Sequence, residues 1–220
     1  MSKSAIILGA TGLTGGKVLQ QLLADARYSK IILFSRSACE ISHDKIEEHL
    51  IDLFELENYK KDFVADDVFC CIGTTKAKTK DEVLYKKIDY VIPVAAAKLA
   101  AENGINNFIV ISALGADAES KLFYNRIKGL MENTVLSKNI DTIYVMQPAL
   151  IGGEREEKRL GEYVAKVLMK LINPFLIGAL KKYKSIHPET IASAMVWLAN
   201  NPYESGRIKS GVIQKISDKA

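Results

Sequence analysis

The stretch that decides the fold lies near the N-terminus and reads Ala5-Ile6-Ile7-Leu8-Gly9-Ala10-Thr11-Gly12-Leu13-Thr14-Gly15-Gly16. Its short apolar run predicts a strand buried on both faces, and the pattern that begins at Leu13 predicts a helix. The first N–H groups of a helix have no intrahelical acceptor, so they favour an anion such as a diphosphate. The sequence therefore predicts a dinucleotide site formed by Gly9, Thr11, Gly12, Leu13, Thr14 and Gly15.

The composition is that of an ordinary globular protein, and it disfavours a nucleic-acid partner. The 220 residues are 48% apolar and 25% charged, with a formal net charge of +4. The lysines are not interleaved with aromatic residues, which disfavours a nucleic-acid partner. Cys39, Cys70 and Cys71 lack metal-ligand spacing and are expected to be buried free thiols. Without a signal peptide or a run long enough to span a bilayer, the chain is expected to be cytoplasmic, with no membrane span.

Strands and helices are expected to alternate along the next part of the chain. Strands are predicted at residues 30–34, 45–50, 67–72, 107–111 and 141–146, and helices at 53–59, 81–103 and 119–138. This alternation predicts an α/β fold, a Rossmann-type doubly wound parallel sheet covered by helices on both faces. The alanines of the 81–103 helix fit either the core or a homodimer face, and Pro93 is expected to bend that helix or to mark its start.

The regular alternation ends at residue 151. Helices are expected at 161–172 and 188–200, an apolar stretch at 173–180 and a last strand at 207–216. We expect a single domain over residues 1–220, in which 151–185 form a small substrate-covering insertion. For 168–180, contact with a membrane surface is an alternative, because a core-covering helix has the same amphipathic pattern.

The ends of the predicted strands carry the remaining cofactor candidates. Arg36 follows the second strand, where no acidic residue stands, and an arginine there would pair with the 2′-phosphate of NADP(H). Asp52 would lie near the adenine with Leu53, or would cap the following helix. The Gly73-Thr74-Thr75 loop and Pro148 lie at the same carboxyl edge of the sheet and complete the predicted site.

Candidate catalytic residues lie in and after the fifth strand. Tyr124 and Lys128 are four residues apart on one helix face, and Lys128 is expected to favour the phenolate. A Tyr-x-x-x-Lys pattern arises about once by chance in a chain with nine tyrosines. Its position twelve residues after Ser112, at the end of a strand, favours the catalytic interpretation. The Ser112 hydroxyl would bind a carbonyl oxygen and Tyr124 would donate a proton.

Together, the glycine loop, Ser112 and the Tyr124/Lys128 pair resemble the short-chain dehydrogenase/reductase superfamily, in its atypical extended branch of NAD(P)H-binding proteins. More narrowly, the chain resembles the Tat-interacting-protein group. The matching stretches are Cys70-Cys71-Ile72-Gly73-Thr74-Thr75, Ser112-Ala113-Leu114-Gly115-Ala116-Asp117, residues 124–129, Gly153-Glu154-Arg155 and Arg159-Leu160-Gly161-Glu162. The resemblance implies a Rossmann fold, bound NADPH, carbonyl reduction by Ser112, Tyr124 and Lys128, and Asp52 and Leu53 near the adenine. The chain departs from the superfamily at Ala113, where a second serine is common. The catalytic asparagine of the superfamily has no assigned counterpart in this sequence, so the proton relay beyond Lys128 is left unassigned.

Three functions compete at this point. The first is an NADPH-dependent oxidoreductase acting on a small carbonyl substrate. The second is a non-catalytic NADP(H)-binding regulator whose cofactor state alters a partner surface. The third, an NAD-dependent sugar-nucleotide epimerase or dehydratase, is disfavoured because 220 residues leave little room for a nucleotide-sugar domain.

Overall fold

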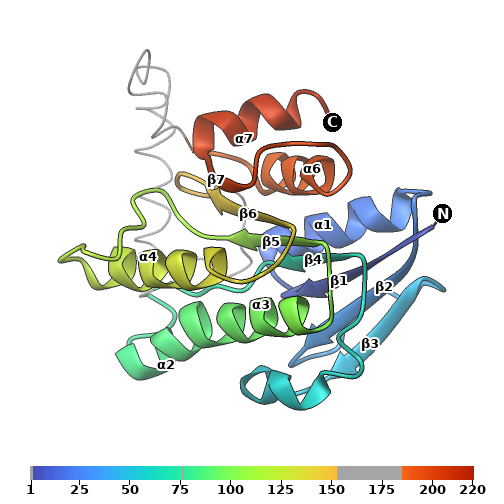
Figure 1. The fold of residues 1–220 in the computed structure, drawn as a ribbon, viewed down its shortest axis with the longest axis horizontal. Helices are drawn as coiled ribbons and strands as arrows, with labels where there is room; N and C mark the ends of the chain where they lie inside the picture. The colour runs from blue at the N-terminus through green and yellow to red at the C-terminus, as the bar shows by residue number, and fades with distance from the viewer. Residues whose placement is uncertain (1, 76, 153–184) are drawn as a thin grey trace.

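The structure is a computed structural model that describes residues 2–75, 77–152 and 185–220. Within them one sheet has the order β3-β2-β1-β4-β5-β6-β7, and every neighbouring pair of strands is parallel (Figure 1). The strands are β1 (Lys3–Leu8), β2 (Tyr28–Ser35), β3 (Ile46–Leu50), β4 (Asp67–Cys70), β5 (Asn107–Ile111), β6 (Thr142–Gln147) and β7 (Gly206–Lys209). The predicted doubly wound parallel sheet is confirmed.

Helices cover both faces of the sheet (Figure 1). One face carries α1 (Leu13–Ala24), α6 (Pro188–Leu198) and α7 (Ser210–Ser217), and the other η1 (Leu53–Tyr59), α3 (Ile92–Glu102) and α4 (Phe123–Leu136). Successive residues of β1 alternate between the two cores: Ala5 and Ile7 pack under α1, while Ile6 and Leu8 pack on the opposite side. Burial on both faces explains why this strand is continuously apolar.

The strand order reverses direction at β1, which pairs with β2 on one side and with β4 on the other. Leu8 at the end of β1 is in register with Phe34 and with Cys70. Ligands of open α/β sheets bind outside the carboxyl ends of the strands at such a switch point. The fold therefore places the Gly9–Gly15 loop and the loop after β4 side by side at the position where a dinucleotide binds.

The helix predicted over residues 81–103 is divided into segments. It consists of α2 (Glu82–Lys86), a π-helical turn η2 (Lys87–Val91) and α3, and Pro93 lies in the first turn of α3. Proline has no N–H to donate to the carbonyl four residues earlier, so the helix widens there, and the Ile92 N–H bonds to the Lys87 carbonyl. Four alanines of α3 (Ala95, Ala96, Ala97 and Ala100) are buried in the core, as one of the two interpretations required.

Two other predicted boundaries were wrong. The helix predicted over 119–138 begins only at Phe123, because Asp117 and Ser120 side chains accept bonds from nearby N–H groups and hold the preceding segment in turns. The strand predicted over 207–216 ends at Lys209, and α7 follows it. Ile213 and Ile216 of α7 are buried at helical spacing, whereas the short apolar pattern of this segment is also compatible with a strand.

The cysteines and the C-terminal insertion complete the comparison with the sequence. Cys70 is buried as expected, whereas Cys39 and Cys71 are half-buried, and all three are free thiols. Burial raises the pKa of the Cys70 thiol to about 12. The predictions for 161–172 and 173–180, the membrane-surface alternative for 168–180 and most of the 151–185 insertion lie outside the described residues.

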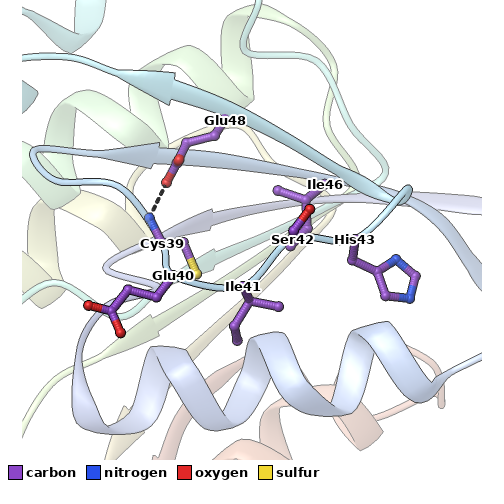
Figure 2. A pocket seen from close by; sticks show the side chains of 7 residues that line it. All are labelled: Cys39, Glu40, Ile41, Ser42, His43, Ile46 and Glu48. Atoms are coloured by element: carbon purple, nitrogen blue, oxygen red, sulfur yellow. Dashed lines mark hydrogen bonds between the residues drawn. The ribbon is translucent and has the colours of Figure 1, made fainter.

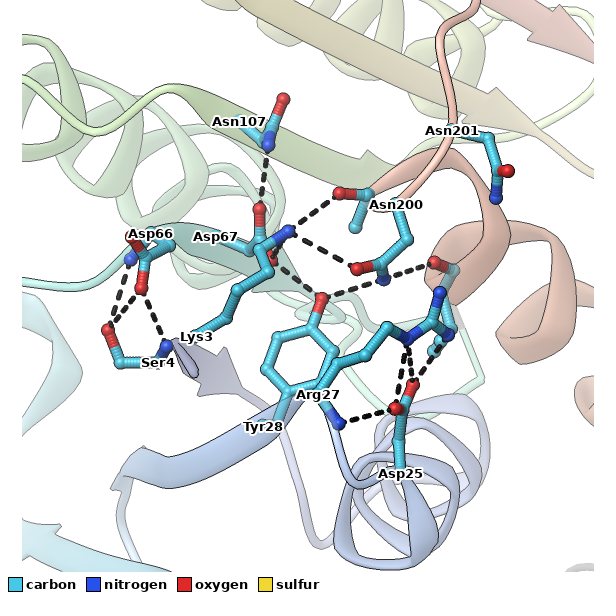
Figure 3. Close-up of polar contacts among 12 residues, drawn as sticks. Lys3, Ser4, Asp25, Arg27, Tyr28, Asp66, Asp67, Asn107, Asn200 and Asn201 are labelled. Atoms are coloured by element: carbon cyan, nitrogen blue, oxygen red, sulfur yellow. Dashed lines mark hydrogen bonds and ion pairs between the residues drawn. The ribbon is translucent and has the colours of Figure 1, made fainter. Parts of the chain in front are cut away.

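At the amino edge of the sheet, a buried carboxylate joins elements from both ends of the chain (Figure 3). Asp67 accepts hydrogen bonds from the Tyr28 hydroxyl at 2.6 Å and from the Asn107 amide at 2.7 Å, and the Lys3 ammonium lies 2.6 Å from its Oδ2. Asn200, after α6, donates to the Tyr28 oxygen. Burial, followed by the charge of Asp67, raises the pKa of Tyr28, so this phenol stays a donor.

Candidate functional site

The glycine loop after β1 has the shape that a diphosphate requires. Gly9 has φ +84°, and the Gly12 amide donates to its carbonyl at 2.9 Å. A Cβ on Gly15 would lie 2.0 Å from the Gly9 oxygen, so only glycine lets the first turn of α1 lie against the loop backbone. No side chain caps α1, and its first turn carries no acidic residue. The loop thus fits the predicted cofactor, because its amides and the helix dipole favour an anion.

The rest of the predicted loop set surrounds this turn. Thr11 is exposed, Leu13 is half-buried and Thr14 is buried, each in or directly before the first turn of α1. The Thr11 position takes the place of a glycine without strain, since no non-glycine residue of the described chain has a positive φ. Contact of these side chains with a cofactor remains a prediction.

Arg36 follows the last residue of β2 and is exposed, as a residue that reaches an adenosine 2′-phosphate must be. The structure brings an acidic side chain from β3 to this strand end, although the sequence has none next to Arg36. Glu48 of β3 accepts from the Cys39 amide at 2.7 Å and from the Ser35 hydroxyl at 3.3 Å. Figure 2 shows Glu48 pointing towards that amide. Glu48 and Cys39 both line a pocket of about 320 Å³. A carboxylate and a guanidinium therefore both adjoin the end of β2.

Asp52 performs the second of its two expected roles. Its Oδ1 accepts from the Phe54 amide at 2.9 Å and caps η1, while Leu53 is buried in the core. Both residues still follow β3 directly at the carboxyl edge. Their proximity to an adenine stays a prediction.

The second loop, Gly73-Thr74-Thr75, is tied to a buried aspartate that the sequence analysis did not select. The Thr74 amide donates to Asp89 Oδ2 at 2.8 Å, and the hydroxyls of Thr74 and Thr79 are 2.9 Å apart. A Cβ on Gly73 would lie 3.5 Å from both Asp89 Oδ1 and Lys128 Nζ. The π-helical turn carries Asp89 beneath this loop. The loop, Asp89 and Lys128 therefore form one connected group.

Lys128 is buried and paired with that aspartate. Its Nζ lies 2.8 Å from Asp89 Oδ1, with side-chain exposures of 3% and 0%, and 3.4 Å from the Ile111 carbonyl at the end of β5. Burial, the largest single influence, lowers the pKa of Lys128, but the charge and hydrogen bond of Asp89 and the nearby Tyr124 and Cys70 groups together raise it, and the net shift is upward. The ammonium is thus held charged beside the residue that precedes Ser112. Asp89 supplies the direct partner of Lys128 that the sequence left unassigned.

Tyr124 lies half-buried one helical turn before Lys128, with its ring packed edge-on against Tyr85 at 6.1 Å between centroids. Burial raises the pKa of Tyr124, the Lys128 charge lowers it, and the Asp89 charge raises it again. The net shift is upward. Lys128 favours the phenolate as expected, but burial, the largest influence, together with the Asp89 charge outweighs it, so the phenol form is favoured.

Ser112 is buried at the end of β5, and its hydroxyl bonds to a second buried acid, Glu132, at 2.5 Å. Glu132 lies four residues after Lys128, so Tyr124, Lys128 and Glu132 share one face of α4. This spacing was the signal from which Glu132 could have been found. For Asp89 a weaker signal existed, an acidic residue four positions before a proline inside a predicted helix.

Tight backbone packing fixes the loop that follows Ser112. The Leu114 amide donates to the carbonyl of Pro148, which is buried after β6, at 2.8 Å. A Cβ on Gly129 of α4 would lie 2.2 Å from the Ala118 nitrogen, so α4 is in direct contact with this loop. Pro148 therefore helps to hold the loop after Ser112 in place. Its contact with a cofactor remains a prediction.

The fold and the glycine cradle, formed by the Gly9–Gly15 loop and the first turn of α1, define a Rossmann-type NAD(P)-binding protein. Residues 9–161 match the model of a family described as NAD(P)H-binding, and the chain belongs to that family. It is 34% identical over 170 residues to protein HTATIP2 of Rattus norvegicus, covering 75% of this chain and 69% of the relative. With the mitochondrial protein FMP52 of Debaryomyces hansenii it shares 28% identity over 212 residues, 92% of this chain and 90% of the relative. The resemblance to the Tat-interacting-protein group is confirmed.

Solved structures agree in fold. UDP-glucose 4-epimerase of Thermotoga maritima has a TM-score of 0.69 at 13% identity, over 98% of this chain and 82% of that chain. An ADP-L-glycero-D-manno-heptose-6-epimerase of Helicobacter pylori has a TM-score of 0.68 at 16% identity, over 99% and 82%. At such identities the likeness is one of architecture alone.

The expected cytoplasmic location is corrected by these relatives. Several FMP52 proteins that match the chain are named as mitochondrial, which points away from the cytoplasm. The expectation rested on criteria for secretion and membrane spans, and such criteria do not distinguish the cytoplasm from an organelle interior. In the parts of the chain that the structure describes, every helix is too short or too polar to cross a bilayer. No group of three or more acidic, histidine or cysteine side chains among the same residues could hold a metal.

Proposed function

We propose that the protein is an NADPH-dependent oxidoreductase that reduces a small carbonyl substrate, with Tyr124 as proton donor. The observation that carries this proposal is the buried Lys128–Asp89 pair, which connects the Gly73–Thr75 loop to the end of β5. Tyr124 lies one turn away on the same helix face, at the sheet edge that holds the glycine cradle. Buried ionisable groups with a specific charge partner are often found where acid–base chemistry takes place, which supports the proposal.

The protonation states suit reduction. The raised pKa of Tyr124 keeps the phenol protonated near neutrality, so it can give its proton to a carbonyl oxygen. When bound, the reduced nicotinamide supplies the hydride to the carbonyl carbon. The C=O double bond then becomes a CH–OH group, and the phenolate that is left behind is stabilised by the Lys128 ammonium. Lys128, held charged by Asp89, also suits a hydrogen bond to the nicotinamide ribose.

For the cofactor we propose NADP(H) over NAD(H), on the strength of Arg36 after β2. Glu48 is the competing feature, because a carboxylate near this strand end suits the ribose hydroxyls of NAD. Titration of the protein with NADPH and NADH, followed by nicotinamide fluorescence, tests this choice. Tighter NADPH binding that is lost in Arg36→Ala supports the proposal, and equal binding of both cofactors removes Arg36 from the site.

Turnover is tested with a panel of small aldehydes and ketones and NADPH. We expect Tyr124→Phe to lose at least about a hundredfold in kcat, because general acid catalysis contributes roughly that much or more. Exchange of Glu102 for Gln, a surface residue paired with Lys60, serves as the matched control. Unchanged hydride transfer in Tyr124→Phe would contradict the assigned role.

A non-catalytic NADP(H)-binding regulator is the second candidate, and one contact favours it. The Ser112 proton is directed at Glu132, away from any bound carbonyl. Tight cofactor binding, no turnover across the panel and a co-purifying protein partner would support this alternative. A small-molecule substrate and a homodimer remain part of the main proposal.

A further inference from the structure

A buried cluster beside the proposed catalytic residues centres on Glu132, whose side chain is fully buried. Its Oε1 accepts from the Ser112 hydroxyl, the Gln147 amide lies 3.0 Å from both carboxylate oxygens, and Arg207 Nε lies 2.6 Å from Oε2. All three partners are donors. They come from three neighbouring strands: Ser112 directly follows β5, Gln147 is the last residue of β6, and Arg207 is the second residue of β7.

The chemistry of these groups fixes the direction of the Ser112 hydrogen bond. A carboxylate paired with a guanidinium only accepts, and a serine hydroxyl has a single proton to donate. The Ser112 amide is also held, since it donates to the Met146 carbonyl at 2.7 Å, which leaves the residue little freedom to turn. With its proton bound to Glu132, the Ser112 oxygen has only lone pairs to offer to the site.

We propose that Glu132 is a positioning residue that makes Ser112 a hydrogen-bond acceptor, so that the site selects the hydroxyl form of its ligand over the carbonyl form. This inference rests on the proposed oxidoreductase function. It reverses the role that the sequence indicated for Ser112, which was donation to a carbonyl oxygen. An alcohol O–H can donate to Ser112, whereas a carbonyl oxygen would face its lone pairs.

Arg207 connects Glu132 to β7, the last strand of the sheet. Its Nε binds Glu132, and a terminal nitrogen donates to Asn133 Oδ1 at 2.6 Å. The guanidinium neutralises the charge of the buried Glu132 carboxylate, and among the described residues no second cation contacts that carboxylate. The polarity of Ser112 therefore depends on a residue 75 positions from Glu132 in the sequence.

The first experiment needs no ligand. In protein carrying ¹³C-labelled serine, the Ser112 hydroxyl proton should give a slowly exchanging, downfield NMR signal because it is buried in a short bond to a carboxylate. The signal should vanish in Ser112→Ala and move upfield in Glu132→Gln, while Glu102→Gln leaves it unchanged. Absence of any such signal, or one that survives in Ser112→Ala, would overturn the assignment of the proton.

The second experiment measures ligand preference with matched pairs: cyclohexanol with cyclohexanone, and benzyl alcohol with benzaldehyde. Binding to the protein–NADPH complex is followed by nicotinamide fluorescence, with the carbonyls added at low temperature and read before turnover. We expect the wild type to bind each alcohol about two- to tenfold more tightly than its carbonyl partner, the effect of one hydrogen bond.

Glu132→Gln should invert this preference. The amide nitrogen of the new Gln side chain can donate to Ser112, which frees the serine proton for a carbonyl oxygen. If that variant does not fold, Ser112→Ala replaces it and should bring both ligand forms to equal affinity. Tighter carbonyl binding by the wild type, or an unaltered ratio in the variants, would refute the inference.

The two experiments separate this inference from the proposed function. If the protein reduces compounds of the carbonyl panel but binds carbonyls more tightly than alcohols, the oxidoreductase proposal stands and the proposed role of Glu132 is wrong. If no alcohol or carbonyl binds, the oxidoreductase proposal fails on these substrates, and the selection of ligand form fails with it. The NMR signal then decides only whether Glu132 orients Ser112.

Discussion

Neutralising one member of the buried Lys128–Asp89 pair should destabilise the protein far more than neutralising both. Among the residues that the structure describes, the Lys128 ammonium in Asp89→Asn keeps the Ile111 carbonyl at 3.4 Å as its one remaining hydrogen-bond partner. In Lys128→Met the Asp89 carboxylate likewise keeps the Thr74 amide. Both side chains are at most 3% exposed, so water cannot replace the lost partner. Each single change should cost about 3–5 kcal/mol of unfolding free energy.

The double variant should lose less than about 2 kcal/mol, because a neutral amide and an apolar side chain of similar volume replace two desolvated charges. The coupling energy of the cycle is then at least about 4 kcal/mol. Urea unfolding at pH 7 measures all four proteins. The exposed pair Lys17–Glu189, 3.0 Å apart, is the control cycle and should couple by less than about 1 kcal/mol. Additive single effects at Asp89 and Lys128, within about 0.5 kcal/mol, would refute the argument.

Three further outcomes follow from the packing and the pKa shifts. Gly15→Ala should destabilise by about 1–3 kcal/mol and weaken NADPH binding, since its Cβ would lie 2.0 Å from backbone, whereas Gly211→Ala, with open space, should stabilise by about 0.5–1 kcal/mol in urea unfolding. The raised folded pKa of Tyr28 means that its contribution to stability is complete below the unfolded value of 10.0 and is lost as the pH rises above it. Tyr28→Phe should therefore reduce the loss of stability between pH 9 and 11 by about 1.4 kcal/mol in total, and an unchanged slope of denaturation over that range would contradict this. Iodoacetamide should modify half-buried Cys39 well before buried Cys70 in the native protein, as peptide mass spectrometry would reveal, and the two rates should converge in urea.

Most of the sheet could be predicted from local pattern. The five downstream strands were predicted to within about two residues at their ends, most of them from apolar runs, and the pattern after Gly12 placed the start of α1 at Leu13. Errors occurred where local chemistry competes with periodicity. Short polar side chains delayed the start of α4, and Pro93 produced a π-helical turn that no apolar pattern reveals.

The sequence by itself determined the strand–glycine–helix cradle, the parallel sheet and the presence of Tyr124 and Lys128 on one helix face, because each of these depends on residues that are neighbours along the chain. Only the tertiary structure decided what those side chains contact. Asp89 reaches Lys128 through a π-helical turn, and Arg207 reaches Glu132 from β7 across the sheet. The direction of the Ser112 hydrogen bond depends on the Glu132 charge, and the pKa of Tyr124 depends first on burial and then on the charges of Lys128 and Asp89. Desolvation and electrostatic interactions both arise between elements that only packing brings together.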